Sequence, residues 1–188
     1  MRATSPVPHG WTLVPLNDVV SFVTSGSRGW AQYYGITGAP FIRIGDLQRG
    51  TLGIDWQHAQ RVSPPDGAEG SRTRVQSGDV LVSITADLGV IGVVPDNIPI
   101  SYINQHVALA RPKGRIHARY LGWYLDAESG GQRQFRDLRR GATKLGLGLE
   151  DIRNVSVPFP DLPEQHRIVA AIEPHFSRLD AAVAALTR

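Results

Sequence analysis

Hydrophobic and polar positions alternate in short blocks over most of the chain. β-branched and aromatic residues gather at residues 39–47, 78–95 and 100–112, and Gly, Pro and polar residues separate these blocks. Short apolar blocks bounded in this way are typical of strands. We expect one strand at 39–47, two buried strands joined by Thr-Ala-Asp-Leu-Gly within 78–95, and one strand with polar residues set into it at 100–112.

Helical segments are expected later in the chain. ARYLGWYLDAES and QRQFRDLRR predict helices separated by Gly130 and Gly131, GATKLGLGLEDI predicts a glycine-punctuated loop, and RNVSVPFP predicts a last strand stopped by prolines. Strands and helices follow no regular βαβ alternation. We therefore expect an α+β fold with a mixed, twisted β-sheet core and flanking helices, followed by a protruding C-terminal helix of the coiled-coil type.

The C-terminal segment has the pattern of a capped amphipathic helix. Asp161 is placed to cap it, Glu164 to complete a capping box, and Pro163 is tolerated in the first turn, whereas Pro174 should kink the helix. Apolar positions spaced 4, 3, 4, 3 form a heptad seam that needs a partner helix, although the same stripe also suits packing back on the domain. The seam consists of Ile172, Phe176, Leu179, Val183 and Leu186.

We accordingly expect two parts: a domain at residues 1–160 and a spacer or dimerisation helix at 161–188. Hydrophobic residues make up 41% and charged residues 20% of the 188, values that fit a folded soluble protein. No run of 18 apolar residues and no N-terminal apolar region is present, so we expect a cytoplasmic protein. The absence of cysteine excludes a disulfide scaffold and a thiolate metal site.

Charge is distributed unevenly although the net charge is only +3. Residues 111–144 hold nine Lys or Arg against three Asp or Glu. A local cationic excess suits a polyanion such as nucleic acid, because binding releases condensed counterions. The same excess also fits a solvated helix face in a protein that prefers arginine.

Catalytic motifs are missing. SPPD at residues 63–66 resembles the Pro-Pro loop of adenine methyltransferases, but Asp66 stands where an aromatic ring should stack on the flipped base. A Pro-Pro turn is the simpler interpretation. No phosphate-binding glycine loop occurs, and the scattered histidines form no helical pair around a Glu, so we expect no metal site.

Two polar stretches have the composition of DNA-reading loops. TSGSRGWAQYY, at residues 24–34, combines small hydroxyls, an arginine that can fork onto guanine, and aromatic rings that can pack on sugars. In the alternative interpretation Trp30 and one tyrosine belong to the core. INQHVALARP sets Asn104, Gln105 and His106 side by side, which suits either adenine reading by Gln105 or internal hydrogen bonding of buried polar groups.

Taken in order, these segments resemble one family, the specificity subunit of type I restriction–modification systems. The resemblance rests on GAPFIRIGDL, GDVLVSITADLGVIGVV, YINQHVALARP, GATKLGLGLEDIRNVSVPFP and the Pro-x-Pro-x-x-Pro-Glu-Gln-x-x-Ile pattern that ends at Ile168. It extends over nearly the whole chain from Trp11 and corresponds to one target recognition domain with its following helix.

The resemblance implies a protein without catalysis or a cofactor of its own. In the family, two recognition domains separated by paired long helices each read half of a bipartite double-stranded DNA sequence. The helices dock modification subunits, which methylate adenine with S-adenosylmethionine, and restriction subunits join some complexes. This chain has one domain and one helix, so it corresponds to a half-subunit that forms a homodimer, a split gene product or a fragment.

The resemblance also assigns residues, because the family places DNA contacts in variable loops of the recognition domain. The expected DNA contacts are Ser27, Arg28, Trp30, Tyr34, Thr85, Asp87, Gln105, His106 and Lys144. The phosphate candidates are Arg133, Arg136, Arg139 and Arg140. The five seam residues would pair the helix with its partner.

Two other functions fit the same residues. One is the recognition region of a fused methyltransferase–nuclease, separated from its catalytic part. The other is a helix-mediated adaptor without sequence preference, whose DNA binding would depend on salt alone.

Overall fold

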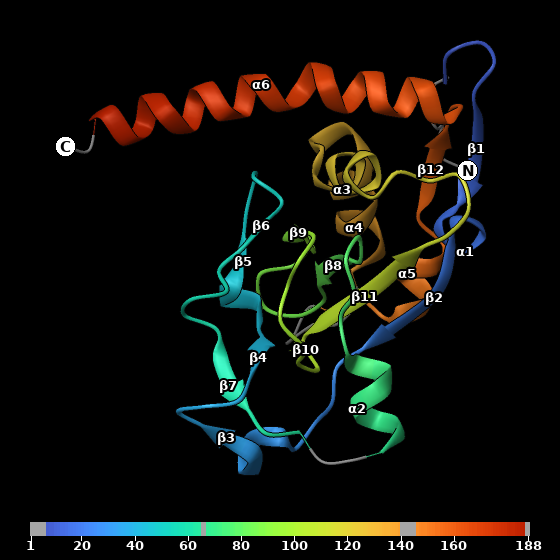
Figure 1. Cartoon of the computed structure of the whole chain (residues 1–188). Helices are drawn as coiled ribbons and strands as arrows, with labels where there is room; N and C mark the ends of the chain where they lie inside the picture. The colour runs from blue at the N-terminus through green and yellow to red at the C-terminus, as the bar shows by residue number, and fades with distance from the viewer. Residues whose placement is uncertain (1–6, 65–66, 140–145, 187–188) are drawn as a thin grey trace.

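Two four-stranded sheets form the centre of the protein in the computed structural model, which describes residues 7–64, 67–139 and 146–186 (Figure 1). The antiparallel sheet has the order β2-β11-β8-β9, from β2 (Val20–Ser25), β11 (Val107–Pro112), β8 (Val80–Ser83) and β9 (Ile91–Val93). All residues of β8 and β9 are buried, since the sheet is covered on both faces. The prediction of two buried strands within residues 78–95 is confirmed.

The second sheet is mixed and has the order β10-β4-β7-β3. It consists of β10 (Tyr102–Ile103), β4 (Ala39–Ile42), β7 (Gln60–Val62) and β3 (Tyr34–Gly35). β10 pairs with β4 in parallel, and the other pairs are antiparallel. The predicted strand at 39–47 is shorter than expected, because a 3₁₀ turn, η2 (Ile44–Asp46), follows β4.

The single strand expected at 100–112 is wrong. Asn104, Gln105 and His106 separate β10 from β11, and the two strands belong to different sheets. Tertiary hydrogen bonds stabilise the break. The backbone N–H of Gly26 donates to the carbonyl of Asn104 at 3.1 Å, and the N–H of Asn104 donates to the carbonyl of Ile42 at 3.0 Å. The chain therefore passes from one sheet to the other at these three polar residues.

Smaller elements complete the domain. β1 (Thr12–Pro15) pairs with β12 (Ser156–Phe159), so the two ends of the domain lie side by side, and β5 (Leu47–Gln48) pairs with β6 (Gly53–Ile54). The helical elements are α1 (Leu16–Val19), η1 (Trp30–Tyr33), α2 (Ala68–Thr73), α3 (Ala118–Asp126), the π-helical η3 (Glu128–Gln132), α4 (Arg133–Leu138), α5 (Leu149–Arg153) and α6 (Leu162–Leu186). The helices expected around Gly130 and Gly131 are present, and α5 lies where a loop was expected. The α+β fold is confirmed.

Three hydrophobic clusters hold these layers together. The largest cluster lies between the antiparallel sheet and helices α3–α6. It includes Val80 and Val82 of β8 together with Leu121 of α3. The second fills the space on the opposite face, around Leu81 and Leu109. The third cluster is aromatic, with Trp30 and Phe41 packed at the mixed sheet. Successive side chains of β8 point to opposite faces of the sheet, so they contribute alternately to the first and the second cluster.

Helix α6 starts as the sequence predicts. The Oδ1 atom of Asp161 accepts a hydrogen bond from the backbone N–H of Glu164 at 3.0 Å. The capping box is wrong in its other half, since the Glu164 carboxylate binds Arg167 at 2.6 and 2.7 Å. Pro174 lies inside the helix, which continues to Leu186.

The first half of the α6 stripe packs on the domain. Ile172 and Phe176 contact the largest core cluster, and the Phe176 ring stacks on Trp123 with centroids 4.4 Å apart. The expectation that these two residues serve a partner helix is therefore corrected in favour of intramolecular packing. Beyond them α6 runs past the body of the domain (Figure 1). The side chains of Leu179, Val183 and Leu186 lie outside the described part of the structure.

Candidate nucleic-acid interface

The polar residues between β10 and β11 form a hydrogen-bonded cluster among the predicted contacts. Thr85 Oγ1 lies 2.8 Å from His106 Nδ1, and Gln105 Nε2 lies 3.0 Å from His106 Nε2. Asn104 Oδ1 accepts the backbone N–H of His106 at 3.0 Å. If the amide nitrogen of Gln105 donates to His106 Nε2, the other ring nitrogen, Nδ1, is left to bond Thr85 Oγ1. The structure thus brings Thr85, Gln105 and His106 together from two separate loops.

Backbone contacts fix this cluster in place. The N–H of Ile84 donates to the carbonyl of His106 at 2.9 Å, and Ser27 forms a parallel bridge with Asn104. A Cβ atom on Gly26 would lie 1.9 Å from the carbonyl oxygen of Ile103, so only glycine allows the first loop to approach so closely. Gly26 was not among the site residues predicted from the sequence, although its place in the small polar segment TSGSRG is typical of a turn.

Thr85 also connects the cluster to the loop before α5. It forms a bridge with Gly146, and the N–H of Leu147 donates to the carbonyl of Ile84 at 3.0 Å. Lys144, a predicted contact in that loop, lies outside the described residues.

Residues of the first loop divide into exposed and buried groups. Arg28 is exposed, and Tyr34 is 41% exposed with its ring 5.7 Å from that of Phe41. Ser27 and Trp30 are 1% and 3% exposed, so the structure corrects their assignment as direct contacts. Trp30 stacks on Phe41 at 5.5 Å, as in the alternative interpretation of this loop.

Asp87 lies near the cluster in sequence but has its own partner. Its carboxylate binds Arg49 at 2.7 Å, and the side chain is 65% exposed. Arg49 also donates to the carbonyl of Leu88, which ties the β5–β6 turn to the loop between β8 and β9. An Asp87 contact to a cytosine amino group would have to compete with Arg49.

The cationic excess of residues 111–144 is partly used inside the protein. Arg111 forms a bidentate pair with the fully buried Asp79, both bonds measuring 2.7 Å. Burial raises the pKa of Asp79, while Arg111 opposes that change. Arg119 pairs with Glu173 and Arg136 with Glu128. Such pairs orient helices and leave less positive charge for phosphates.

Three of the four phosphate candidates belong to the described chain. Arg133, Arg136 and Arg139 are exposed on or next to α4, and Arg140 lies outside the described residues. Arg136 and Arg139 line a cavity of about 270 Å³ together with Arg49 and Glu128. The cavity joins α4 to the loop that carries Asp87, so the phosphate candidates lie beside a predicted contact.

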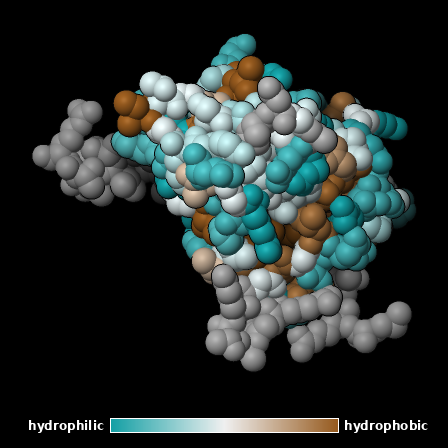
Figure 2. Space-filling model, turned by 90° about the horizontal axis from the view of Figure 1, so that it is seen from below, coloured by the Kyte–Doolittle hydropathy of each residue, from teal (hydrophilic) through white to brown (hydrophobic). Residues whose placement is uncertain are grey.

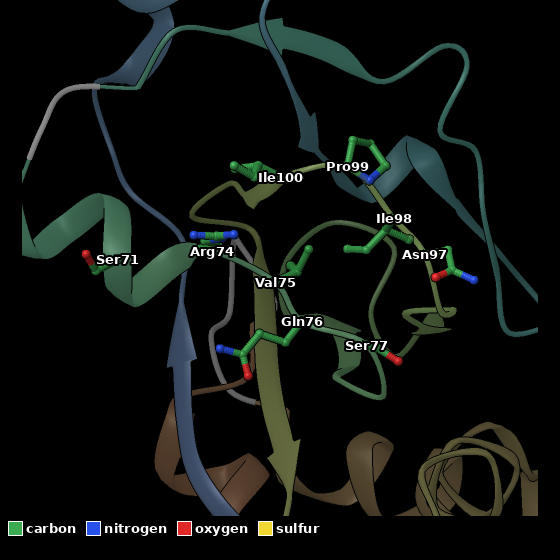
Figure 3. Close-up of a pocket in the computed structure, with 9 residues that line it drawn as sticks. All are labelled: Ser71, Arg74, Val75, Gln76, Ser77, Asn97, Ile98, Pro99 and Ile100. Carbon is green, nitrogen blue, oxygen red and sulfur yellow. The ribbon is translucent and has the colours of Figure 1, made fainter.

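A second hollow, of about 590 Å³, lies between the end of α2 and residues 97–100 (Figure 3). Arg74, Gln76 and Asn97 line it beside Ile98 and Ile100, with no carboxylate or histidine in the lining. It therefore lacks acid–base groups. The end of the molecule opposite α6 is largely hydrophilic with hydrophobic patches (Figure 2).

No group of three His, Asp or Glu residues that could hold a metal ion occurs in the described ranges. Nor does any helix there combine the length and apolar character needed to cross a membrane.

Comparison with known proteins gives consistent results. Residues 8–184 match the family model of the type I restriction modification DNA specificity domain. The chain is 28% identical over 178 residues to the type I restriction enzyme EcoBI specificity subunit of Escherichia coli, covering 93% of this chain and 37% of that protein.

Solved structures with the same fold include two at 26% identity. The HsdS subunit from Thermoanaerobacter tengcongensis has a TM-score of 0.69 and covers 100% of this chain. A chain from a study of complex assembly and conformational transition of the type I R-M system has a TM-score of 0.70 and covers 97%. The match covers 41% of either solved chain, so this chain spans about two fifths of the length of its relatives.

Proposed function

Because this chain belongs to the type I restriction–modification DNA specificity domain family, we propose that it reads one half of a bipartite double-stranded DNA sequence for a DNA adenine methyltransferase complex. The family match over residues 8–184 carries the proposal. The chain itself acts without catalysis, and S-adenosylmethionine binds to a separate modification subunit. In this proposal residues 1–160 correspond to the recognition domain, and residues 161–188, which include α6, correspond to the part that spaces or pairs two such domains.

The cluster around His106 supports a reading role. His106 is bonded through both ring nitrogens, which fixes the amide group of Gln105 in one orientation. Gln105 Oε1 has no hydrogen-bond partner among the described residues, and it can accept a hydrogen bond from the amino group of adenine or cytosine. A side chain fixed before binding loses less conformational entropy on contact.

The exposed cations provide affinity rather than sequence choice. Arg133 and Arg139 are exposed and suit phosphate oxygens, which carry no base identity. Their contribution to binding should fall as salt concentration rises.

The test is to co-express this chain with the modification subunit of its own locus in a methylation-free host, and to map modified adenines at single-base resolution. A palindromic bipartite motif would support two identical chains paired through α6. An asymmetric motif would mean that a different recognition domain supplies the second half. If the complex assembles and no adenine is methylated, the proposed function is refuted.

A further inference from the structure

Ile36 is the most exposed large hydrophobic side chain in the described part of the chain. It is 99% exposed, compared with 52% for Ile100, 41% for Tyr34 and 38% for Leu13. A side chain in this position contributes almost no apolar burial to folding. Its hydrophobic surface is therefore free to contact a binding partner.

Ile36 lies in a short connection between two strands that both pair with β7. Val62 of β7 pairs with Tyr34 on one side and with Ala39 on the other, so the three residues 36–38 must cross over β7. Gly38 allows this crossing with φ of +110°, and a Cβ atom there would lie 2.6 Å from the carbonyl oxygen of Val62. Isoleucine is β-branched, so its χ1 angle is restricted to few rotamers. The tip is thus short, and the only large apolar side chain of residues 36–38 is that of Ile36.

An aromatic cluster packs on the strands next to the tip. Trp30, Phe41 and Val62 are buried at 3% or less, and Tyr33 and Tyr102 pack around them. The Trp30 and Phe41 rings stack with centroids 5.5 Å apart. These contacts anchor the strands on either side of residues 36–38, so the tip projects from a packed base.

The segment that carries the tip has a charge that suits a polyanion. The sequence contains no Asp or Glu between Asp18 and Asp46, and this interval includes Arg28 and Arg43. Arg28 is exposed, and Arg61 lies opposite Gly35 in the strand pair beside the tip. A segment that carries arginines and no carboxylate is complementary to the phosphates of duplex DNA rather than to an acidic partner.

Resting on the function proposed above, we propose that Ile36 is a specificity-determining residue that packs on the 5-methyl group of a thymine in the major groove. The thymine methyl is the apolar group that the major groove presents, and the groove is about 12 Å wide, enough to admit a narrow turn. Arg61, which lies opposite Gly35 beside the tip, would hold a flanking phosphate. Sequence choice at this base pair comes from the methyl contact and not from a hydrogen bond.

The experiment uses the complex of the full chain with its modification subunit and short synthetic duplexes that carry the mapped motif. Each thymine of the half-site is replaced in turn by uracil, which lacks only the methyl group. For the wild-type complex we expect one position where the replacement weakens binding about four-fold, as burial of one methyl group predicts. With Ile36→Ala, thymine and uracil at that position should bind equally, while the other positions respond as in the wild type.

Ile100→Ala is the matched control, because it removes a partly exposed isoleucine at the hollow beside α2 and should leave the uracil pattern unchanged. An identical uracil pattern in the wild type and in Ile36→Ala would overturn the inference while the proposed function stands. A uniform loss over all sequences would also overturn it, as would failure of Ile36→Ala to assemble with the modification subunit. A wild-type complex that does not distinguish the motif from a scrambled duplex would refute both proposals.

Discussion

Side chains of the proposed interface differ in how firmly the fold holds them. His106 is bonded on both ring nitrogens, whereas Arg28 is exposed and has no hydrogen-bond partner among the described residues. A free arginine keeps its full fork of donors for guanine or phosphate, and ordering it on binding costs side-chain entropy. Arg28 is therefore suited to a contact made only in the complex.

Replacing Arg28 with alanine should cost about 1–3 kcal/mol of binding free energy at one base position if the guanidinium reads a guanine. The check is to measure affinity for duplexes that differ at each base of the half-site. Arg133→Ala serves as the comparison, because a phosphate contact should weaken all sequences equally and reduce the salt slope. Equal loss for every duplex with Arg28→Ala would make Arg28 a phosphate contact instead.

His117 should make stability depend on pH. It caps α3, with Nδ1 accepting from the N–H of Tyr120 at 3.3 Å. Burial lowers its pKa, the nearby His166 and Arg119 lower it further, and Glu173 raises it. The unfolded chain therefore takes up a proton first, and stability should be lost as pH falls from about 6.5 toward the lower folded pKa.

The measurement for His117 is the melting temperature between neutral pH and about pH 5, a range set by the histidine reference value. His117→Asn keeps a good capping residue and removes the titrating ring, so its melting temperature should fall less over the same interval. If both proteins lose stability in parallel, other groups cause the pH dependence.

Among the described elements α6 is the longest, and one buried amide fixes its first turns. Gln165 is fully buried. Its Oε1 accepts the backbone N–H of His117 at 2.7 Å, and its Nε2 donates to the carbonyls of Arg115 and Pro160, both at 2.9 Å. Further along, Phe176 stacks on Trp123. The direction in which α6 leaves the domain is therefore set by contacts at both ends of its packed half.

Gln165→Ala should lower the free energy of unfolding by about 2–3 kcal/mol, because it leaves one backbone N–H and two carbonyls without partners. Urea unfolding monitored by tryptophan fluorescence measures the loss. Arg167→Ala, which removes an exposed ion pair with Glu164, should leave the unfolding midpoint close to the wild-type value. Equal effects of the two changes would mean that the Gln165 bonds add nothing to stability.

For the molecule as a whole, the relevant fact is its length relative to its relatives. The match covers 97–100% of this chain but only 41% of each of the two solved chains at 26% identity. We propose that the chain holds one recognition domain followed by α6. A bipartite reader requires a second recognition domain, and two copies related by a two-fold axis would supply it through identical surfaces. The half of α6 beyond Phe176 is the segment we propose for that pairing.

Replacing Leu179, Val183 and Leu186 together with serine should then convert a dimer to a monomer, as measured by sedimentation of the purified chain. The same variant should lose methylation of a palindromic motif when co-expressed with the modification subunit. Ala171→Ser, a change at an exposed position on α6, is the control and should alter neither result. A wild-type chain that sediments as a monomer, alone and in the assembled complex, would refute this pairing.

Local sequence determined much of the molecule. The two buried strands within residues 78–95, the helices around Gly130 and Gly131, and the Asp161 cap of α6 follow from apolar runs, glycine positions and a capping carboxylate. Each depends on groups a few residues apart, so the linear pattern contains the necessary information. The family also follows from the order of these segments.

Tertiary structure decided what each polar or apolar residue faces. Contacts between distant residues divide 100–112 between two sheets at Asn104, where Gly26 binds, and bury Trp30 against Phe41. The same kind of contact turns Phe176 onto Trp123 and leaves Ile36 uncovered at a crossing over β7. Periodic spacing of apolar residues indicates that one face of a helix or strand will be buried. Which surface covers it depends on the packing of the whole chain, and a linear pattern does not contain that information.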